Sequence, residues 1–475
     1  MTKASPLGFG LLVVLCAAVT LLYFPVWHGQ FLYDDLWYIV QNPFVHRPLA
    51  FIPLFADART VAAPQSGLST DVYRPLTTLW FWIDSHLWGP NTFPYHVENL
   101  LLHIVNGLLL FTLLRRWTEN FWGALAGCAV FLLHPVQVQS VAWITQRSTL
   151  AATACLLTAL LFLIGRPEPL RRSWLLGIAA ATAALFFRET SIVLPLLAGI
   201  VLLGQNRRPW IIVLVLVGVS VVYLGTRQAV LHQWSQVPQP SESWIANAAL
   251  GILAFPVYLA KIIIPVKLRV SYAYPAVTLV RVGLSLLVWL LYAVSVFYVG
   301  RKDRWMAAGL LWIWIGLLPV LQIVPIRAFV AERFLYLPMI GVAVIVCRSV
   351  SRLAGPWLYV PWLFFLTVMT CKTAPDWKNE QSLWAEAVAQ DPGNAFAHLC
   401  YGAALGDSDA AIEQYRQTLA CHPNADQHFI AVNNLSNVLL HQGKKREALF
   451  WARKAIDQNP ESPEALYNMT QAENR

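Results

Sequence analysis

The sequence predicts an all-α protein, in which a polytopic membrane helix bundle of about eleven spans is followed by a C-terminal tetratricopeptide-repeat solenoid. Of the 475 residues, 57% are hydrophobic and only 12% are charged, far from the average of soluble proteins. The apolar residues gather in runs long enough to cross ~30 Å of hydrocarbon. Near residue 375 the composition becomes that of a soluble helical region. We therefore expect a membrane domain at 1–374 and a repeat domain at 375–475.

The first apolar run, 7–27, follows Lys3 and has no small-residue cleavage site after it, which is typical of an uncleaved signal anchor. Residues 28–96 are too polar to span a membrane and too aromatic for a linker. We expect them to fold as the first external loop.

Ten further apolar segments follow this loop, at 97–114, 121–135, 149–165, 173–187, 190–204, 209–226, 280–299, 305–321, 335–347 and 355–371. Alternate connections carry basic clusters, namely Arg115 with Arg116, Arg166 with Arg171 and Arg172, Arg207 with Arg208, Arg301 with Lys302 and Arg304, and Arg348 with Arg352. The positive-inside rule therefore predicts a cytoplasmic N-terminus.

Residues 245–266 are apolar enough to span, but Lys261 and Lys267 interrupt them, and Pro256 and Pro265 would break a straight helix. A span here would also break the alternation of basic connections. We expect an interfacial or re-entrant pair of short helices, which leaves eleven spans and places the repeats outside the cytoplasm.

Three prolines mark the expected repeats. Pro392, Pro423 and Pro460 are spaced by 31 and 37 residues, which average the 34 residues of a tetratricopeptide repeat. The concave face of such an array usually holds an extended peptide or a helix, which predicts an acceptor protein or peptide as a partner.

The charge and cysteine patterns argue against two other classes of site. The net charge of +9 comes from clusters between apolar runs, where membrane orientation explains it, so no nucleic-acid site is predicted. The seven cysteines form no CxxC pair, and we assign no metal ligands. No cofactor is required by the pattern, although a divalent cation beside the acidic residues of the first loop stays open.

Asp34 and Asp35 lie side by side a few residues past the first apolar run. Two adjacent carboxylates repel each other at the edge of the hydrocarbon, so one can keep a raised pKa while the other stays ionised. The pair is therefore a candidate general base. The alternative is that it only caps the signal anchor on the outside.

Polar residues beside the spans form a second group of candidates. They are His134, Arg147, Arg188, Glu332 and Arg333. External arginines depart from the charge rule and favour an anion-binding surface, with Arg147 expected to bind the phosphate of a donor. The alternative is a set of ion pairs: Arg188 with Glu189, Arg333 with Glu332 or Asp57, and Arg147 with Glu98 or Asp84.

One chemistry suits an acidic pair and external arginines at a membrane surface. A sugar on a polyprenyl phosphate leaves a stabilised anion, which needs cations rather than a general acid. The acceptor hydroxyl needs a base. A carboxylate on the opposite face of the sugar then gives single displacement with inversion.

Five stretches carry a resemblance to a known family: FLYDDLWYIVQNPFV, the run from VYRPLTT to NGLLLF, LLHPVQVQSVAWITQRSTLAA, FRETSIVLP and AERFLYLPMIGVAV. The chain resembles the transmembrane and tetratricopeptide-repeat-containing O-mannosyltransferases and their bacterial relatives, which belong to the GT-C glycosyltransferase superfamily. The resemblance implies a GT-C type fold, a catalytic acid in the first external loop, and dolichyl or polyprenyl phosphate mannose as the donor.

The resemblance also implies roles for individual residues. Asp34 would be the base, Asp35 would orient the acceptor or help bind a cation, and Arg74 would lie near the pair. His96 begins a polar face of the second span that continues through Asn99, His103 and Asn106 at helical spacing. We count His96 among the substrate-binding candidates and interpret the face as polar packing, with a metal-binding role for His96 and His103 as the alternative.

We therefore predict an inverting glycosyltransferase of a bacterial inner or cell membrane. It would move mannose or another hexose from a polyprenyl-phosphate carrier to Ser or Thr hydroxyls of proteins outside the cytoplasm. One alternative is a transferase that modifies a lipid or a cell-surface glycan. The other is a non-catalytic scaffold, whose membrane domain anchors the repeats. Membrane lipids are partners in every case.

Overall fold

The computed structural model describes residues 6–66, 72–164, 171–205, 210–232, 244–323, 326, 328–352 and 356–473. These residues form helices and no β-strand, which agrees with the predicted all-α class. They divide into two compact units, with residues 1–268 and 275–377 in unit 1 and residues 269–274 and 378–475 in unit 2. Three arginines used to infer orientation, Arg166, Arg207 and Arg208, lie outside the described residues.

The body of unit 1 is built from α1 (Pro6–Leu22), α5 (Thr92–Thr118), α6 (Phe121–Leu133), α8 (Arg147–Leu163), α9 (Arg171–Phe187), α10 (Leu194–Gly204), α11 (Trp210–Leu231), α12 (Trp244–Ile263), α13 (Leu279–Lys302), α14 (Arg304–Leu317), α15 (Met339–Arg352) and α16 (Val360–Thr373). Each predicted apolar segment forms one of these helices. By length and composition, five described helices can cross a membrane, and a sixth crossing is formed if α6 and the bent segment after it count as one. The chain is therefore a multi-pass membrane protein.

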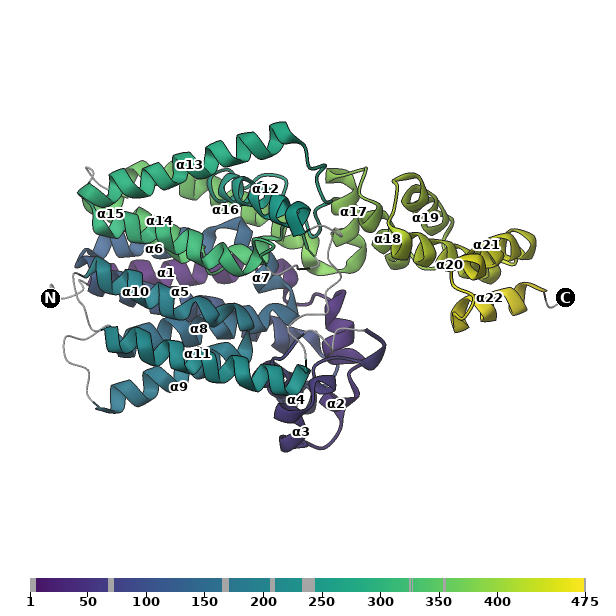
Figure 1. Ribbon diagram of the computed structural model, residues 1–475, viewed down its shortest axis with the longest axis horizontal. Helices are drawn as coiled ribbons and strands as arrows, with labels where there is room; N and C mark the ends of the chain where they lie inside the picture. The colour runs from purple at the N-terminus through teal and green to yellow at the C-terminus, as the bar shows by residue number, and fades with distance from the viewer. Residues whose placement is uncertain are drawn as a thin grey trace. The chain divides into compact units, whose positions relative to one another are not determined.

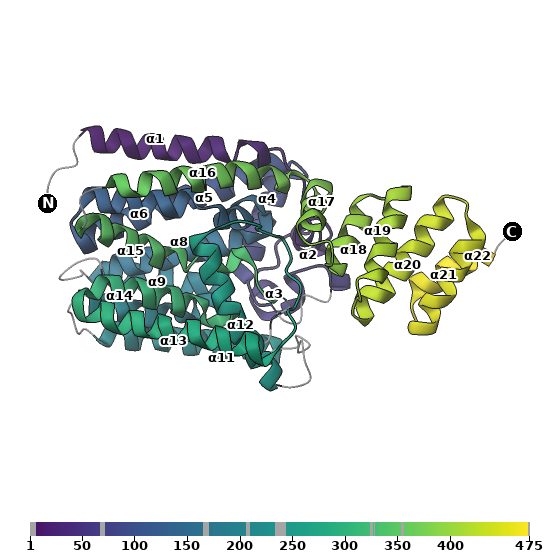
Figure 2. The same ribbon diagram turned by 90° about the horizontal axis from the view of Figure 1, so that it is seen from above.

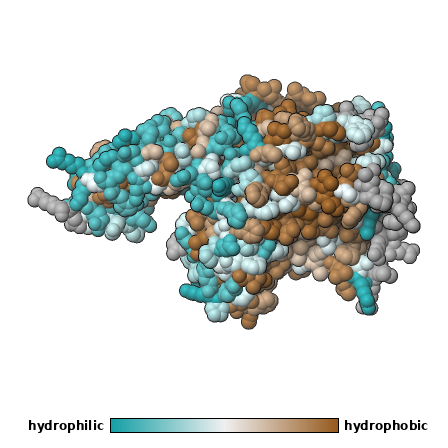
Figure 3. Space-filling view, turned by 180° about the vertical axis from the view of Figure 1, so that it is seen from behind, coloured by the Kyte–Doolittle hydropathy of each residue, from teal (hydrophilic) through white to brown (hydrophobic). Residues whose placement is uncertain are grey.

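The outer face of the bundle is apolar, as lipid contact requires. Figure 3 shows hydrophobic surface spread across the helices of unit 1. On α13, the side chains of Leu279 and Val280 are 93% and 72% exposed. Inside the bundle, small residues let helices approach closely: a Cβ atom on Gly341 of α15 would collide with the carbonyl oxygen of Gly309 on α14.

One end of the bundle, here called the basic end, collects the connections that carry the basic clusters. Asp303 between α13 and α14 forms ion pairs with Arg348 and Arg352 at the end of α15. Trp117 near the end of α5 stacks on Trp305 at the start of α14, with ring centroids 5.3 Å apart. These contacts place the described basic clusters after α5, α13 and α15 together, as the charge rule predicts.

The opposite end of unit 1, here called the loop end, carries the predicted first external loop. Its short helices are α2 (Pro43–His46), α3 (Phe51–Ala56) and α4 (Pro75–Trp88). Figure 1 shows them grouped at one end of the long helices. Asn42 caps α2 by accepting the backbone N–H of Phe44, and its amide donates to the carbonyl of Thr60. The loop is thus a folded element and not a linker.

Residues 244–263 form the single helix α12, which continues through Pro256. The predicted pair of short helices is therefore wrong. The ring of Phe255, next to the proline, stacks on Trp289 of α13 with centroids 4.1 Å apart, and the indole of Trp289 donates to the carbonyl of Ile252. These tertiary contacts offset the hydrogen bond that proline removes.

The helix α12 nevertheless stays at the loop end. Gly251 packs against the carbonyl of Leu321, which follows α14, and the carbonyl of Ile262 accepts a hydrogen bond from His134, which follows α6. Figure 2 shows α12 inclined to α13. Although α12 is long and apolar enough to span, it connects α11 and α13 at the same end. The expected eleven spans therefore stay a prediction, and the described helices that are long and apolar enough to cross a membrane account for five or six crossings.

Unit 2 contains six described helices: α17 (Glu380–Gln390), α18 (Ala395–Ala404), α19 (Asp409–Ala420), α20 (Ala425–His441), α21 (Lys445–Gln458) and α22 (Pro463–Glu473). Each packs on the next in sequence. Gly402 gives room for the ring of Tyr415, Ala448 and Ala455 are fully buried, and Gly443 turns the chain with a φ of 74°. The tetratricopeptide assignment of these pairs remains a prediction.

Candidate functional site

The two adjacent acids at the loop end have different surroundings. Asp35 is 0% exposed, and its carboxylate accepts hydrogen bonds from the backbone N–H of Leu32 at 2.9 Å and of Thr145 at 2.8 Å. Burial raises the pKa of Asp35 to about 7, although these two bonds oppose the shift. Asp34 is only half-buried. Asp35 thus ties the first loop to residues 144–146 and leaves Asp34 accessible.

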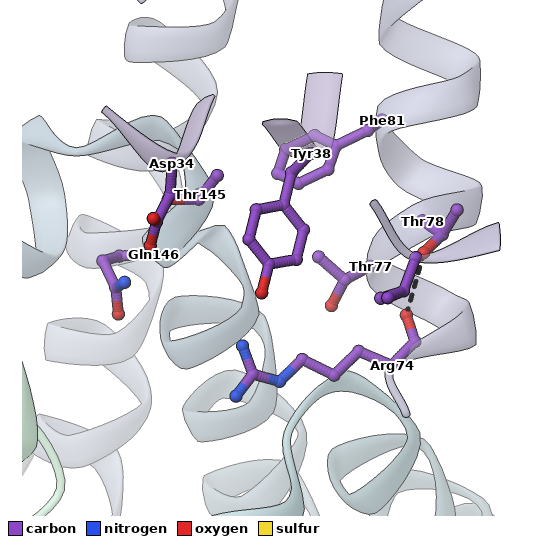
Figure 4. A pocket seen from close by; sticks show the side chains of 9 residues that line it. Asp34, Tyr38, Arg74, Thr77, Thr78, Phe81, Thr145 and Gln146 are labelled. Carbon is purple, nitrogen blue, oxygen red and sulfur yellow. Dashed lines mark hydrogen bonds between the residues drawn. The ribbon is translucent and has the colours of Figure 1, made fainter. Parts of the chain in front are cut away.

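Asp34 lines a pocket of about 350 Å³, counting the space open to solvent. The other lining residues are Tyr38, Val61, Arg74, Thr77, Thr78, Phe81, Thr145 and Gln146. In Figure 4, Asp34 and Gln146 lie on one side of the cavity and Arg74 lies across from them, with the Tyr38 hydroxyl directed toward its guanidinium group. The structure therefore brings Asp34 and Arg74 together, as the family motifs implied.

Arg74 is held in place by Glu189. Its Nε donates to one carboxylate oxygen at 2.8 Å, and its Nη2 donates to the other at 2.5 Å. Burial lowers the pKa of Arg74, but the charge of Glu189 and these bonds outweigh it, so the pKa is raised. Glu189 forms its ion pair with Arg74. The expected ion pair between Arg188 and Glu189 is therefore replaced by one between Arg74 and Glu189.

Arg188 is 6% exposed, and the hydrogen bonds that it donates to the described residues go to neutral acceptors. Its Nη1 donates to Gln146 Oε1 at 3.1 Å, Ser148 Oγ at 3.0 Å and Thr149 Oγ1 at 2.6 Å. Burial, followed by the positive charge of Arg74, lowers the pKa of Arg188 to about 9. A buried cation with neutral acceptors is well suited to attract an anion.

Arg333 lies on the side of Asp34. Its guanidinium group packs over the rings of Trp143 and Phe334, at 5.2 Å and 4.9 Å from the centroids. Burial lowers the pKa of Arg333, and the negative charge of Asp34 opposes this shift. Glu332 is buried beside it. Asp57 pairs with Arg59, so the predicted alternative of an ion pair between Arg333 and Asp57 is wrong.

Arg147 is 0% exposed, and all three of its side-chain nitrogens are engaged. Nε donates to Asn99 at 2.9 Å, Nη2 donates to the carbonyl of Tyr95 at 2.8 Å, and Nη1 donates to Glu98 at 2.7 Å and also to Asp84. Four of the five N–H donors of Arg147 are thus used within the fold, which favours a structural role over the expected role in binding the donor phosphate. The ion-pair alternative is the arrangement formed.

Two predicted substrate-binding histidines lie away from the pocket. His134 caps the turn after α6: its Nδ1 accepts from the N–H of Val136 at 3.3 Å, and its Nε2 donates to the carbonyl of Ile262 at 3.0 Å. His96 is buried on α5 and does not line the pocket that contains Asp34. Both residues therefore fit a packing role better than substrate binding.

The polar face of α5 is used for hydrogen bonds within the bundle. His103 interacts with the hydroxyl of Tyr336 and the carbonyl of Leu132, and Asn106 donates to Tyr336 and to the carbonyl of Leu150. Within the part of the chain that the structure describes, no group of three His, Cys, Asp or Glu side chains is arranged to hold a metal ion. The packing interpretation of this face is the one that the contacts support.

The pocket contains residues that the sequence did not single out. Tyr38 follows Asp34 by about one helical turn, and Gln146 immediately precedes Arg147 in one of the family-like stretches. Those two spacings are the signals that could have identified them. Thr77 and Thr78 follow Arg74 on α4, but only the fold reveals that this turn faces Asp34.

Comparisons with known proteins place the chain among relatives of one kind. No family model matches the chain. It is 25% identical over 451 residues to the protein O-mannosyl-transferase F38B6.6 of Caenorhabditis elegans, covering 90% of this chain and 64% of the relative. Human protein O-mannosyl-transferase TMTC1 is 26% identical over 516 residues, covering 90% of this chain and 57% of the human protein.

A shorter match, to the protein O-mannosyl-transferase Tmtc1 of Drosophila melanogaster, is 35% identical over 191 residues and covers 39% of this chain. The chain thus spans less than two thirds of the length of these curated relatives. The crystal structure of ArnT from Cupriavidus metallidurans, bound to undecaprenyl phosphate, matches 98% of this chain and 75% of its own, with 13% identity and a TM-score of 0.43. The expected resemblance is confirmed: over most of its length, the chain is similar to the protein O-mannosyl-transferases.

Proposed function

We propose that the chain is an inverting glycosyltransferase that moves a hexose from a polyprenyl phosphate to a Ser or Thr hydroxyl of a protein. The observation that carries this proposal is the pocket itself, in which the accessible carboxylate of Asp34 lies across from the guanidinium group of Arg74. Arg188 adds a second positive charge, close enough to Arg74 to lower its own pKa. Binding of a phosphate would relieve this repulsion.

In the proposed reaction, Asp34 accepts the proton of the acceptor hydroxyl while the hydroxyl oxygen attacks the anomeric carbon. The bond from that carbon to the phosphate oxygen breaks, and the polyprenyl phosphate leaves as an anion stabilised by Arg188 and Arg74. Attack from the face opposite the phosphate inverts the anomeric centre. Arg333, on the side of Asp34, would orient the base.

Asp35 has a positioning role in this proposal. Because its carboxylate joins the backbone of Leu32 to that of Thr145, it fixes the first loop against a turn that itself contributes to the pocket. This role differs from the expected one of orienting the acceptor. No step needs a divalent cation, since arginines supply the positive charge.

The variant Asp34→Asn tests the function. We expect it to fold normally and to lose about 10²–10⁴-fold in transfer rate, because an amide cannot accept the proton. The measurement is the rate of hexose transfer from a synthetic polyprenyl-phosphate mannose to an acceptor peptide. Asp57→Asn, which changes a partly exposed acid of the same loop paired with Arg59, is the matched control. Equal rates for wild type and Asp34→Asn would refute the assignment.

The acceptor distinguishes the proposal from its main alternative. Cells with and without the chain can be compared by mass spectrometry of envelope proteins and of extracted lipids and glycans. We expect a hexose to disappear from Ser or Thr residues of proteins. Its loss from a lipid or a surface glycan alone would establish the alternative transferase.

The side of the membrane is part of the proposal. We infer that the pocket and the repeats are extracytoplasmic, because the loop end lies opposite the basic clusters, and α16, which precedes the repeats, corresponds to the eleventh span predicted from the sequence. A cysteine replacing Lys444, in a background without Cys371, Cys400 and Cys421, should react with a membrane-impermeant reagent on intact spheroplasts. Reaction only after lysis would show that the repeats are cytoplasmic. A cysteine replacing Arg116 at the basic end is the control for the opposite side.

A further inference from the structure

The turn that carries Asp34 has an unusual backbone. Residues 32–35 form a tight turn, in which the carbonyl of Leu32 accepts the backbone N–H of Asp35 at 2.8 Å. Tyr33, the second residue of this turn, has a φ of 45°, in the left-handed region that glycine and asparagine favour and a bulky side chain rarely adopts. Such a conformation persists only where the surrounding contacts hold it. Asp34 follows Tyr33 directly, so its position depends on those contacts.

Trp143 supplies two of these contacts. Its indole N–H donates to the same carbonyl of Leu32 at 3.3 Å, and its ring contacts the ring of Tyr33, with centroids 6.1 Å apart. Trp143 is 2% exposed and Leu32 is 1% exposed, so water does not compete for this hydrogen bond. The carboxylate of Asp35 adds a third contact by accepting the N–H of Leu32. The turn is therefore held by its own Asp35 and by Trp143, a residue more than 100 positions away.

The same indole carries Arg333. The guanidinium group of Arg333 lies over the ring of Trp143, at 5.2 Å from the centroid. The backbone N–H of Arg333 donates to Oε1 of Gln139 at 2.8 Å, and Gln139 lies on α7 (Val138–Ala142), which ends immediately before Trp143. The negative charge of Asp34 acts on Arg333, where it opposes the lowering of the arginine pKa by burial. One short segment, 139–143, thus holds both the backbone and the side chain of Arg333.

We propose that Trp143 is a positioning residue of the transferase, which holds the turn at 32–35 and the guanidinium group of Arg333 against each other and so sets the place of Arg333 beside Asp34. The proposal rests on the glycosyltransferase function given above. Trp143 acts on the base through the turn and on the cation through its ring. A ring under a guanidinium group fixes the plane of that group without using its N–H donors, which stay available to a carboxylate.

Two substitutions separate the two actions of the indole. Trp143→Phe removes the N–H but keeps an aromatic face for Arg333, whereas Trp143→Leu removes both. Both variants should lower the rate of hexose transfer by about two- to tenfold, the value of one neutral hydrogen bond. Only Trp143→Leu should also move the low-pH limb of the rate profile upward, by about 0.5–1 pH unit, because a carboxylate base is protonated more readily once a nearby cation moves away.

The titratable groups around Asp34 and Arg333 are the same in wild type and in both variants. They are Asp35, Tyr38 and Arg74 near Asp34, and Tyr33, Arg188, Tyr258 and Glu332 near Arg333. A moved low-pH limb therefore reports the place of Arg333. Trp82→Phe is the matched control, because the indole N–H of Trp82 donates to the carbonyl of Arg47 in the same loop and not to the turn. It should leave both the rate and the low-pH limb as in wild type.

Hydrogen–deuterium exchange tests the hold on the turn without any activity. In both Trp143 variants, the peptide that contains residues 33–36 should exchange faster than in wild type, because the turn opens more often once a contact is lost. Unchanged exchange in both variants would overturn the proposal, as would an unmoved low-pH limb in a folded Trp143→Leu. If Trp143→Leu does not fold, the exchange of Trp143→Phe decides alone. If the wild type transfers no hexose, the proposed function fails, and the exchange result still decides whether Trp143 holds the turn.

Discussion

Two arginines are buried at the loop end, Arg147 and Arg188, and they have opposite surroundings. Arg147 meets two carboxylates, Asp84 and Glu98. Arg188 donates to a carboxamide and two hydroxyls. A charge neutralised by buried partners stabilises the fold, whereas a charge with neutral acceptors stays available to an anion. The same residue type therefore serves structure in one place and binding in the other.

The network of Arg147 also explains how the pocket is held. Glu98 accepts hydrogen bonds from the indoles of Trp80 and Trp88, both at 3.0 Å, so α4 and α5 are joined to the start of α8. Thr145, two residues before Arg147, donates to Asp35. The ion pairs of Arg147 thus fix the position of the turn at 144–146. This turn holds Asp35, and so positions its neighbour Asp34.

The largest expected effect is that of Arg147→Ala on stability. Removing one partner of a buried ion pair leaves two carboxylates uncompensated and costs about 3–5 kcal/mol. Thermal unfolding of the purified protein should show a large fall in Tm. A variant that melts like wild type but needs more donor would show that Arg147 binds phosphate after all. Arg416→Ala, in an exposed ion pair of unit 2, is the control and should cost about 0–1 kcal/mol.

Arg188→Gln should have a smaller effect, and on binding rather than on folding. A hydrogen bond to a charged group is worth about 1.5–3 kcal/mol, so the KM for a polyprenyl-phosphate donor should rise by about 10- to 150-fold. The free energy of unfolding should change little, because the acceptors left behind are neutral and two of them can rotate. A large loss of stability with an unchanged KM for the donor would show that Arg188, like Arg147, stabilises the fold and does not bind the donor.

A further expected effect concerns Asp35, and it depends on pH. Burial raises its pKa from an ordinary 3.8 to about 7, so the folded protein holds a proton that the unfolded chain releases between these values. The stability from this proton is complete below about pH 4 and is lost as the pH rises through about 7. Wild type should therefore lose stability relative to Asp35→Asn over this window.

Unfolding of both proteins at the two ends of this pH window measures the difference. The amide side chain of the Asp35→Asn variant cannot titrate, and all other groups are shared, so the difference isolates Asp35. Parallel pH dependence would show that the carboxyl group stays ionised in the fold.

Local sequence was sufficient for the helices, because apolar runs and basic clusters are short-range signals. It failed at α12, since Pro256 is tolerated only through contacts with Trp289, a residue far along the chain. The same limit applies to the arginines. Glu189 pairs with Arg74, 115 residues away, rather than with its neighbour Arg188.

Within the candidate site, the sequence could identify Asp34 and Arg74. It could not identify which of the neighbouring residues are accessible and which are used to hold the fold together. Whether Asp34 or Asp35 is accessible depends on which of them meets the N–H of Thr145, 110 residues away from Asp35. That choice is made by the tertiary fold. Thr77 and Thr78 become candidate site residues only because the fold brings α4 against the first loop.

The most direct measurement is the rise in Tm that saturating undecaprenyl phosphate produces in wild type, Arg147→Lys and Arg188→Gln. A ligand that binds only the folded protein raises its Tm. Arg147→Lys should melt below wild type, because lysine cannot make the same set of bonds, but should keep the ligand-induced rise. Arg188→Gln should melt close to wild type and lose the rise. The reverse pattern, with the rise lost in Arg147→Lys and kept in Arg188→Gln, would contradict the separation of a structural from an anion-binding arginine.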